Sequence, residues 1–318
     1  MSILVTGGAG YIGSHVVRLL NLRGDDVVVL DDLSTGHGAR ISDVPLIRLD
    51  LSSDESVDLL QRSIERHRID AVIHVAAQKQ VGQSMERPTF YMRQNVGGMI
   101  NLLDAMETTG VRRLVFSSSA AAYGAPNVAE IDENTECVPI TTYSETKLIG
   151  EQMCDRSAAA WGLAAASLRY FNVAGAGWPD LGDPVALNLI PIVFDRLASG
   201  ARPHVFGDDY PTPGRVLHPR LRARPRSRRG ACPGPRPPRI CRTPGVQHRH
   251  RSRVQRLRGH RRGRSCDWPG HDSRGRRATP GRPARLVGNA AKAAAELGWR
   301  ANRELPEIIA SAWAARQG

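Results

Sequence analysis

The stretch T-G-G-A-G-Y-I-G at residues 6–13 follows the apolar run Ile3-Leu4-Val5 and precedes a helical pattern that begins near His15. Because glycine has no Cβ, such a turn can be tight, and a pyrophosphate can approach the backbone N–H groups at the positive end of the helix. The glycines fit the pattern G-x-G-x-x-G, which is informative only between a strand and a helix, as here. The stretch therefore predicts a dinucleotide-binding βαβ unit.

Asp31 ends the next apolar strand pattern, residues 26–30, and follows the glycine turn by about 20 residues. In such units an acidic residue at this place bonds the ribose 2′-hydroxyl, and its charge repels a 2′-phosphate. The alternative is an ordinary solvated carboxylate at a strand end. In this context Asp31 favours NAD over NADP as the cofactor.

Strand and helix patterns alternate through the first 171 residues. Strands separated by helices imply parallel βαβ units. We therefore expect an α/β fold, with a doubly wound parallel Rossmann sheet in an NAD-binding domain (residues 1–171) and a smaller C-terminal substrate lobe (residues 172–318). The later strand patterns cover 47–50, 71–75, 113–117 and 165–170, and the helical patterns cover 53–67, 89–109, 143–161, 289–299 and 306–316.

The composition of this 318-residue chain excludes several classes of protein. Its five cysteines show no C-x-x-C spacing, which predicts neither a zinc site nor a disulfide framework. Apolar runs stay well short of the roughly 20 residues of a membrane span, and the first strand pattern starts at Ile3 with no basic leader before it. We expect a soluble, cytoplasmic protein without a metal site.

The net charge of +13 comes from one segment. Residues 214–282 contain 22 Arg, no Lys and two Asp, a charge of +20, whereas the rest of the chain carries −7. This segment is rich in Pro and Gly and has almost no apolar periodicity, so burial cannot repay its ordering entropy. We expect the middle of the substrate lobe to be disordered.

Polar clusters follow the strand at 113–117 and open the helix at 143–161. The first is Ser117-Ser118-Ser119, and the second contains Tyr143 and Lys147, which lie one turn apart on one helix face. A Lys ammonium favours the phenolate of a neighbouring Tyr and lowers its pKa, while a Ser hydroxyl can share a substrate proton. A Tyr/Lys pair on a solvated helix face is the more ordinary explanation of this spacing. Behind a nucleotide-binding turn, the cluster instead predicts a base for a sugar hydroxyl.

Six motifs follow one another along the first 213 residues. They are T-G-G-A-G-Y-I-G-S-H, D-D-L-S-T-G, H-V-A-A, F-S-S-S-A-A-A-Y-G, Y-S-E-T-K and L-R-Y-F-N-V-A-G-A. In this order and spacing they resemble the extended short-chain dehydrogenase/reductases, the NAD-dependent epimerase/dehydratase family, and within it most closely the UDP-glucose 4-epimerases. The resemblance resumes near residue 283 with P-A-R-L-V and A-A-A-E-L-G-W.

The resemblance implies roles for individual residues. Tyr143 would be the general base, Lys147 would lower its pKa and bind the nicotinamide ribose, and Ser119 would bond the reacting hydroxyl. Asp32 stands where the family usually has Asn. On the cofactor side the implied residues are Gly7, Gly10, Tyr11, Ile12, Gly13, Asp31, Asp32, Ser34, Thr35, Gly36, Asp50, Leu51, Ala76, Lys79, Asn95, Tyr143, Lys147 and Phe171. On the substrate side they are Ser119, Tyr143, Asn172 and Asn188.

The resemblance also implies a reaction. Hydride leaves C4 of a UDP-sugar for tightly held NAD, the 4-keto sugar rotates, and hydride returns to its other face, which interconverts UDP-glucose and UDP-galactose. Related dehydratases carry an acidic pair where Ala120-Ala121 stand here, which argues against water elimination. Another nucleotide-sugar epimerase or a decarboxylase would share these motifs. A homodimer, formed through the helices near 89–109 and 143–161, is implied by the family.

The Arg-rich segment interrupts the resemblance. We interpret it as the translation of a shifted reading frame in a GC-rich gene. Codons read one base out of frame over residues 219–228 permit the family's R-D-Y-V-H-V-x-D-L-A, and those over 246–252 permit Y-N-I-G-T-G-G. The alternative is an evolved Arg-rich arm for nucleic acid or acidic lipid, although the segment has few aromatic residues for base stacking.

This interpretation has a functional consequence. In the family the segment supplies the Arg that pairs with the substrate diphosphate, and Arg282 aligns with an Asp that contacts uridine. We therefore expect this chain to bind NAD but to bind UDP-sugars weakly or not at all, and so to be an impaired epimerase or an inactive NAD-binding protein. Polyanion binding in vitro would follow from charge alone. We expect no membrane partner and no physiological nucleic-acid partner.

Overall fold

The computed structural model describes residues 1–42, 44–185, 188–201 and 286–317. The Arg-rich segment, residues 214–282, lies outside these ranges, so the predicted disorder and the shifted reading frame remain predictions. So does the assignment of residues 172–318 to a separate substrate lobe.

A six-stranded parallel sheet forms the centre of the molecule, in the order β3-β2-β1-β4-β5-β6. This order is that of a doubly wound Rossmann sheet, with β1 beside the point where the chain direction switches from one edge to the other. The α/β fold predicted from the alternating patterns is confirmed. The strands are β1 (Ser2–Thr6), β2 (Asp26–Asp31), β3 (Leu46–Arg48), β4 (Ala71–His74), β5 (Arg113–Ser119) and β6 (Ala164–Tyr170).

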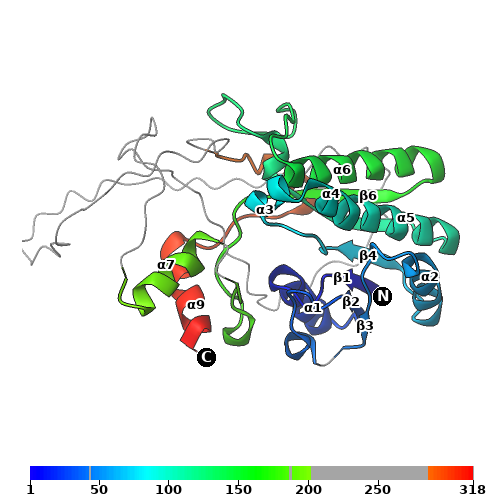
Figure 1. Ribbon diagram of the computed structural model, residues 1–318, viewed down its shortest axis with the longest axis horizontal. Helices are drawn as coiled ribbons and strands as arrows, with labels where there is room; N and C mark the ends of the chain where they lie inside the picture. The colour runs from blue at the N-terminus through cyan, green and yellow to red at the C-terminus, as the bar shows by residue number, and fades with distance from the viewer. Residues whose placement is uncertain (43, 186–187, 202–285, 318) are drawn as a thin grey trace, which may run out of the picture.

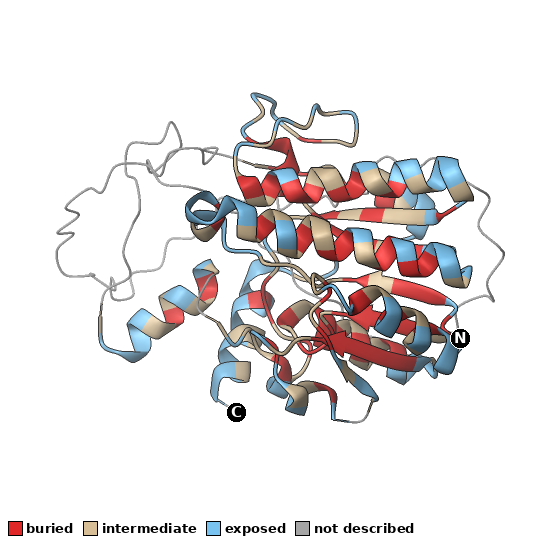
Figure 2. Ribbon diagram, turned by 45° about the vertical axis from the view of Figure 1, so that its right-hand side comes forward, coloured by how far each residue is buried: buried red, intermediate tan, exposed pale blue. Residues whose placement is uncertain are grey.

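Successive residues of the central strands face opposite sides of the sheet, because side chains alternate along a strand. Leu4 and Val28 belong to a core with α2 (Ser56–Arg66), α5 (Gly98–Thr109) and α6 (Thr142–Trp161). Their neighbours Ile3 and Val27 belong to a second core with α1 (Tyr11–Arg23). Both faces are therefore covered, which is why β1 and β2 are buried after their first residues (Figure 2).

The helix predicted over residues 89–109 is helical throughout but is not one regular α-helix. It consists of α4 (Pro88–Tyr91), a π-helical segment (Met92–Gly97) and α5. A short helix, α3 (Val81–Glu86), precedes it. Insertions of π-helix are frequent at functional sites. Here the insertion includes the predicted cofactor residue Asn95.

The described C-terminal residues form three helices beside the sheet. They are α7 (Leu189–Ala198), α8 (Ala291–Leu297) and α9 (Leu305–Gln317), which place α8 and α9 where the sequence predicted helices. Helices α7 and α9 lie together to one side of the sheet (Figure 1), and Phe194 meets Trp313 edge to face at 4.9 Å between ring centroids. An isolated bridge between Ile131 and Gly288 ties the chain after the Arg-rich segment back to the first half.

Candidate active site

The turn between β1 and α1 is packed so closely that only glycine fits. Gly7 has a φ of +69°, and a Cβ there would lie 2.6 Å from the backbone nitrogen of Ala76. A Cβ on Gly13 would lie 2.0 Å from the Gly7 carbonyl oxygen. The first turn of the helix is therefore pressed against the loop. This close packing is what brings the backbone N–H groups within reach of a pyrophosphate.

The first turn of α1 has the features of an anion-binding helix N-terminus. Gly10 is the N-cap, contributes no side-chain cap, and the turn contains no acidic residue. The helix N-terminus therefore presents N–H groups and the positive end of its dipole. Tyr11 and Ile12 stand at the start of the helix, next to the position where the predicted pyrophosphate would lie.

Asp31 sits at the carboxyl end of β2, beside the glycine turn. It is 6% exposed, and its two carboxylate oxygens accept hydrogen bonds from the N–H groups of Ala9 and Leu33, each at 2.9 Å. Burial raises its pKa, and these two backbone bonds oppose that shift. The carboxylate is thus oriented by the backbone, as an acceptor for a ribose hydroxyl requires.

The loop after β2 folds around this carboxylate. Gly36 is buried, and a Cβ there would lie 2.8 Å from the Ala9 methyl group and 3.0 Å from Asp31. Asp32 accepts bonds from the backbone N–H and the hydroxyl of Ser34, at 2.9 and 2.7 Å, whereas Thr35 is exposed. The D-D-L-S-T-G motif therefore builds a local turn that closes over the end of β2.

A second polar cluster forms after β3. Asp50 accepts bonds from the backbone N–H and hydroxyl of Ser52, both at 2.8 Å, and from Gln94 at 3.2 Å. Burial would raise the pKa of Asp50, but these bonds outweigh burial and lower it. Leu51 packs into the main core. Gln94 had no motif to mark it in the sequence and was missed.

The loop after β4 is braced by Asn95 from the π-helical segment. Asn95 is 8% exposed, and its amide pairs with both backbone groups of Gln78, at 2.8 and 3.0 Å. It also donates to Thr146 of α6 at 3.0 Å. The structure therefore uses Asn95 to join three elements at the site. Ala76 borders the glycine turn, and Lys79 is exposed at the end of the same loop.

Ser119, Tyr143 and Lys147 come together at the carboxyl end of β5. Thr141 caps α6 in a capping box with Ser144, which fixes the start of the helix. The Ser119 hydroxyl lies close enough to Tyr143 to act on the pKa of its phenol. Lys147, 4% exposed, donates to the Ser117 carbonyl at 2.8 Å. The predicted cluster thus assembles from one strand end and one helix face.

The acid–base properties of this cluster differ from the sequence expectation in one respect. Burial raises the pKa of Tyr143, and it is Ser119 that opposes the rise; Lys147 was expected to lower it. Lys147 is itself desolvated. Burial lowers the pKa of Lys147 to about 8, against an opposing effect of Glu151.

The predicted substrate-side residues lie after β6. Phe171 packs against Ala120 and Tyr123, and Asn172 is exposed. Asn188 is the N-cap of α7 and donates to Asp183 at 2.5 Å. These residues are spread along the chain that leaves the sheet, so the described structure does not gather them as tightly as Ser119, Tyr143 and Lys147.

Helix α1 also anchors this exit segment. The Tyr11 hydroxyl donates to the Gly175 carbonyl. His15, with no exposed surface, donates from Nδ1 to the Tyr11 carbonyl at 2.8 Å and accepts at Nε2 from the Gly177 N–H at 3.0 Å. The nucleotide-binding helix and the start of the C-terminal part are therefore joined by buried hydrogen bonds. His15 belongs to the first sequence motif, but the sequence did not show that it bonds to Gly177.

The residues present fit a dinucleotide. A cradle that any Cβ would fill, an uncapped helix N-terminus and a backbone-oriented carboxylate stand side by side at the carboxyl ends of β1 and β2. Among the described residues, groups of three or more side chains suited to a metal ion are not found. Within the same residues, helices are too short or too polar to cross a membrane.

The fold and the glycine turn define a dinucleotide-binding protein, in which Ser119, Tyr143 and Lys147 lie at the same edge of the sheet. A sequence profile described as "NAD dependent epimerase/dehydratase family" matches residues 3–212. The chain belongs to that family.

Individual relatives agree with this assignment. The chain is 45% identical over 217 residues to a UDP-glucose 4-epimerase of Azospirillum brasilense, and 46% identical over 217 residues to one of Streptomyces lividans. These matches cover 66% of this chain but only 61% and 64% of the relatives, so the chain matches less than two thirds of their length. A crystal structure of the Brucella ovis UDP-glucose 4-epimerase in complex with NAD aligns over 98% of this chain, with a TM-score of 0.75 and 31% identity. Another crystal structure of a UDP-glucose 4-epimerase aligns with a TM-score of 0.80 and 30% identity over 100% of this chain.

Proposed function

We propose that this chain is built as an NAD-dependent UDP-glucose 4-epimerase, which interconverts UDP-glucose and UDP-galactose. The observation that carries the proposal is the convergence of Ser119, Tyr143 and Lys147 at the carboxyl end of β5, on the same sheet edge as the glycine turn and Asp31. The similarity to epimerases supports the choice of substrate. The site-residue roles given below are part of the proposal.

NAD would be held by the glycine turn, the first turn of α1 and the Asp31 carboxylate. When bound, it supplies the acceptor that takes hydride from the sugar carbon and returns it. Tyr143 would take the proton of the C4 hydroxyl and later give it back, while Ser119, which acts on the pKa of Tyr143, would orient that hydroxyl. Because the proton and the hydride both return, the reaction has no net redox change.

Lys147 supplies positive charge next to this proton transfer. With a pKa of about 8, the ammonium is largely protonated at neutral pH and loses its proton as the pH rises through 8. The positive charge of Lys147 is therefore present below this pH and is lost above it. We expect turnover to decline above about pH 8 for this reason.

Two other functions share these residues. A 4-epimerase or decarboxylase for another sugar nucleotide would use the same Ser, Tyr and Lys. Ala120 and Ala121 open the 3-10 turn after Ser119, so that position offers no carboxylate for water elimination. An NAD-binding protein without turnover is the second alternative, because the matched part falls short of the full epimerase length.

The test is to measure UDP-glucose/UDP-galactose interconversion by the printed chain beside a version with the reading frame of residues 214–282 restored. We expect turnover in the restored chain alone. Tyr143→Phe in that background should lower kcat by roughly 10²–10⁴-fold. Normal turnover by the printed chain would refute the impairment. Turnover in neither chain would refute the proposal that UDP-glucose and UDP-galactose are the substrates. UDP-N-acetylglucosamine and UDP-glucuronate would then be screened.

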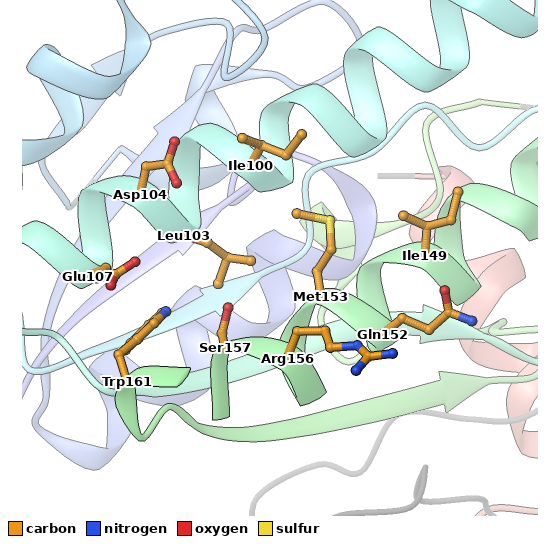
Figure 3. Close-up of a pocket in the computed structure, with 10 residues that line it drawn as sticks. All are labelled: Ile100, Leu103, Asp104, Glu107, Ile149, Gln152, Met153, Arg156, Ser157 and Trp161. Carbon is orange, nitrogen blue, oxygen red and sulfur yellow. The ribbon is translucent and has the colours of Figure 1, made fainter. Parts of the chain in front are cut away.

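We also propose that two copies pair through α5 and α6. A groove of about 420 Å³ runs between these helices and is lined by apolar residues, among them Ile100, Leu103 and Met153, and by charged residues (Figure 3). Asp104 and Glu107 on α5 could meet Arg156 of a second copy, since a two-fold axis brings each patch onto itself. We also propose a cytoplasmic location, on the composition and cysteine spacing of the chain.

Sedimentation of the chain tests this pairing. Met153→Arg places a charge in the groove and should convert a dimer to a monomer. Leu22→Arg, on an exposed position of α1, is the matched control and should leave the mass unchanged. A monomer at all concentrations before any substitution would contradict the proposal.

A further inference from the structure

A buried ion pair lies directly behind the Ser, Tyr and Lys cluster. Glu151 and Arg169 are each 7% exposed. The Arg169 Nε donates to both carboxylate oxygens, at 2.8 and 3.1 Å, and its Nη2 donates to one of them at 2.5 Å. These bonds outweigh the effect of burial and raise the pKa of Arg169, so the guanidinium stays charged.

The pair connects every element that carries the cluster. Glu151 lies two turns after Tyr143 and one turn after Lys147 on α6, and it accepts a hydrogen bond from the Ser118 hydroxyl of β5. Arg169 of β6 lies opposite Ser118 in the sheet. The Nη1 of Arg169 donates to the Tyr123 hydroxyl at 2.6 Å, in the turn that follows Ser119.

We propose that Glu151 and Arg169 are a positioning pair for the site: they lock the Ser117–Ser119 strand end onto α6 and hold the Lys147 ammonium in its charged form beside Tyr143. This proposal rests on the function proposed above in one point, the role of Lys147 in the proton transfer. Neither residue is a catalytic residue, because each acts through Ser118, Ser117 or Lys147.

A purely structural role is the competing explanation. Buried ion pairs often add little to stability over well-packed apolar residues, because both charges lose their hydration. The geometry here goes further than a structural pair needs. One carboxylate contacts the strand of Ser119 and sits one helical turn from Lys147, so its charge acts on the site itself.

The surroundings of Lys147 leave Glu151 as its acidic partner among the described residues. From α6 it is faced by Tyr143 and Glu151. From β4 it is faced by His74, whose pKa is lowered to about 3 by burial and by Lys147, so that the imidazole is neutral. From β5 it is faced by the Ser117 carbonyl and by the Phe116 ring, whose centroid is 5.1 Å from Nζ. From β6, Arg169 acts on it through Glu151.

The pKa of Lys147 can be measured without substrate, cofactor or turnover. The sequence contains three lysines, Lys79, Lys147 and Lys292, so a chain labelled with ¹³Cε-lysine gives few signals. Lys79→Met and Lys292→Met assign the remaining signal. A pH titration of the full chain should then give a pKa of about 8 for Lys147.

Glu151→Gln keeps the shape of the side chain and removes its charge. We expect the pKa of Lys147 to fall by about one unit, because a compensating charge is lost in a desolvated site. Glu145→Gln removes the same charge from an exposed position of the same helix and should change it by no more than about 0.2 units. An unchanged pKa in a folded Glu151→Gln chain would overturn the proposal.

Glu151→Gln leaves Arg169 without its partner and could prevent folding. The double variant Glu151→Gln with Arg169→Met removes both charges and should fold, and a smaller fall in the Lys147 pKa is expected in it, because the repelling charge of Arg169 is also gone. If neither variant folds, the pair is structural and the proposal fails. Because the readout is a titration, absence of epimerase turnover in any of these chains would count against the proposed function and not against this proposal.

Discussion

The two halves of the described molecule differ in how completely they bury their own apolar side chains. Around the sheet, two cores contain 19 and eight buried residues, drawn from β1–β5 and their helices in nearly continuous sequence. Around α7 and α9, the core contains four, Ala174, Ile190, Phe194 and Ile308. On the same two helices, Leu189, Leu197, Ile309 and Trp313 remain between 38% and 46% exposed.

This contrast shows which part of the site is self-sufficient. The glycine turn, Asp31 and the Ser, Tyr and Lys cluster rest on a core built from neighbouring βα units, so most of their packing comes from the first half of the chain. The helices of the C-terminal part join segments on either side of residues 202–285. The contacts of this part with the first half include the bonds of Tyr11 and His15, the Arg18–Asp180 pair and the bridge at Gly288. Cofactor binding and substrate binding should therefore fail independently.

The largest expected effect is a loss of NAD affinity when the glycine turn in the first half is changed. Gly13→Ala puts a Cβ 2.0 Å from the Gly7 carbonyl and 2.6 Å from the Gly8 Cα, contacts that only a backbone shift can relieve. We expect NAD affinity, measured by calorimetry, to fall by roughly 100-fold or more. Gly82→Ala is the control, because a Cβ there meets nothing within 4 Å on helix α3, and it should leave binding unchanged. Equal affinity in both variants would show that the turn does not hold the cofactor.

Truncating one buried side chain in each half should lower the free energy of unfolding by different amounts. Leu102 has no exposed surface and belongs to the larger core, and Leu102→Ala should lower the free energy of unfolding by about 2–5 kcal/mol. Ile308 is 1% exposed and belongs to the small core. Ile308→Ala should lower the free energy of the main unfolding transition by less than Leu102→Ala does, because the small core has fewer residues. Urea unfolding followed by circular dichroism compares them. An equal loss in the main transition would mean that the two halves unfold as one unit.

The buried His74 in the nucleotide-binding half should make the stability of the fold sensitive to acid. This ring is 3% exposed and bonds to the Thr6 hydroxyl at 2.7 Å, and burial lowers its pKa to about 3. On acidification the unfolded chain therefore binds this proton first, near pH 6.5, so stability is lost as the pH falls below that value. Between pH 6.5 and pH 5 the loss should be about 2 kcal/mol. In His74→Asn this part of the slope should vanish; the same slope in both chains would locate the acid sensitivity elsewhere.

The smallest expected effect concerns the contact between the halves. Arg18 of α1 makes two bonds to Asp180, at 2.9 and 2.6 Å, but both side chains are partly exposed. Arg18→Ala should cost only about 0.2–1 kcal/mol, and less at high salt. Thermal unfolding in low and high salt checks this. A loss well above that range would show that the exit segment is held mainly by this surface pair and not by the buried bonds of Tyr11 and His15.

Local patterns predicted the fold well because the βα units are themselves local. The strand and helix of each unit are adjacent in sequence, so short apolar runs that alternate with helical patterns located the six strands of the sheet to within a few residues. The π-helical segment at Met92–Gly97 was missed, since it depends on the bracing of Asn95 by Gln78 and Thr146, which lie in other elements.

The site could be predicted only where a motif marks it. Tyr143 and Lys147 stood out by their spacing, and the same spacing continues to Glu151, a signal that was available in the sequence. Its partner Arg169 lies inside a strand pattern, and only the register of β5 with β6 places it opposite Ser118. Direct effects of burial on pKa, such as those at Lys147 and His74, likewise required the packed structure.

The most direct measurement is calorimetry of the printed chain with NAD and then with UDP-glucose, beside the chain in which the reading frame of residues 214–282 is restored. Both chains should bind NAD with the same affinity, and only the restored chain should bind UDP-glucose. Failure of the printed chain to bind NAD, or equal UDP-glucose binding by both chains, would contradict this prediction.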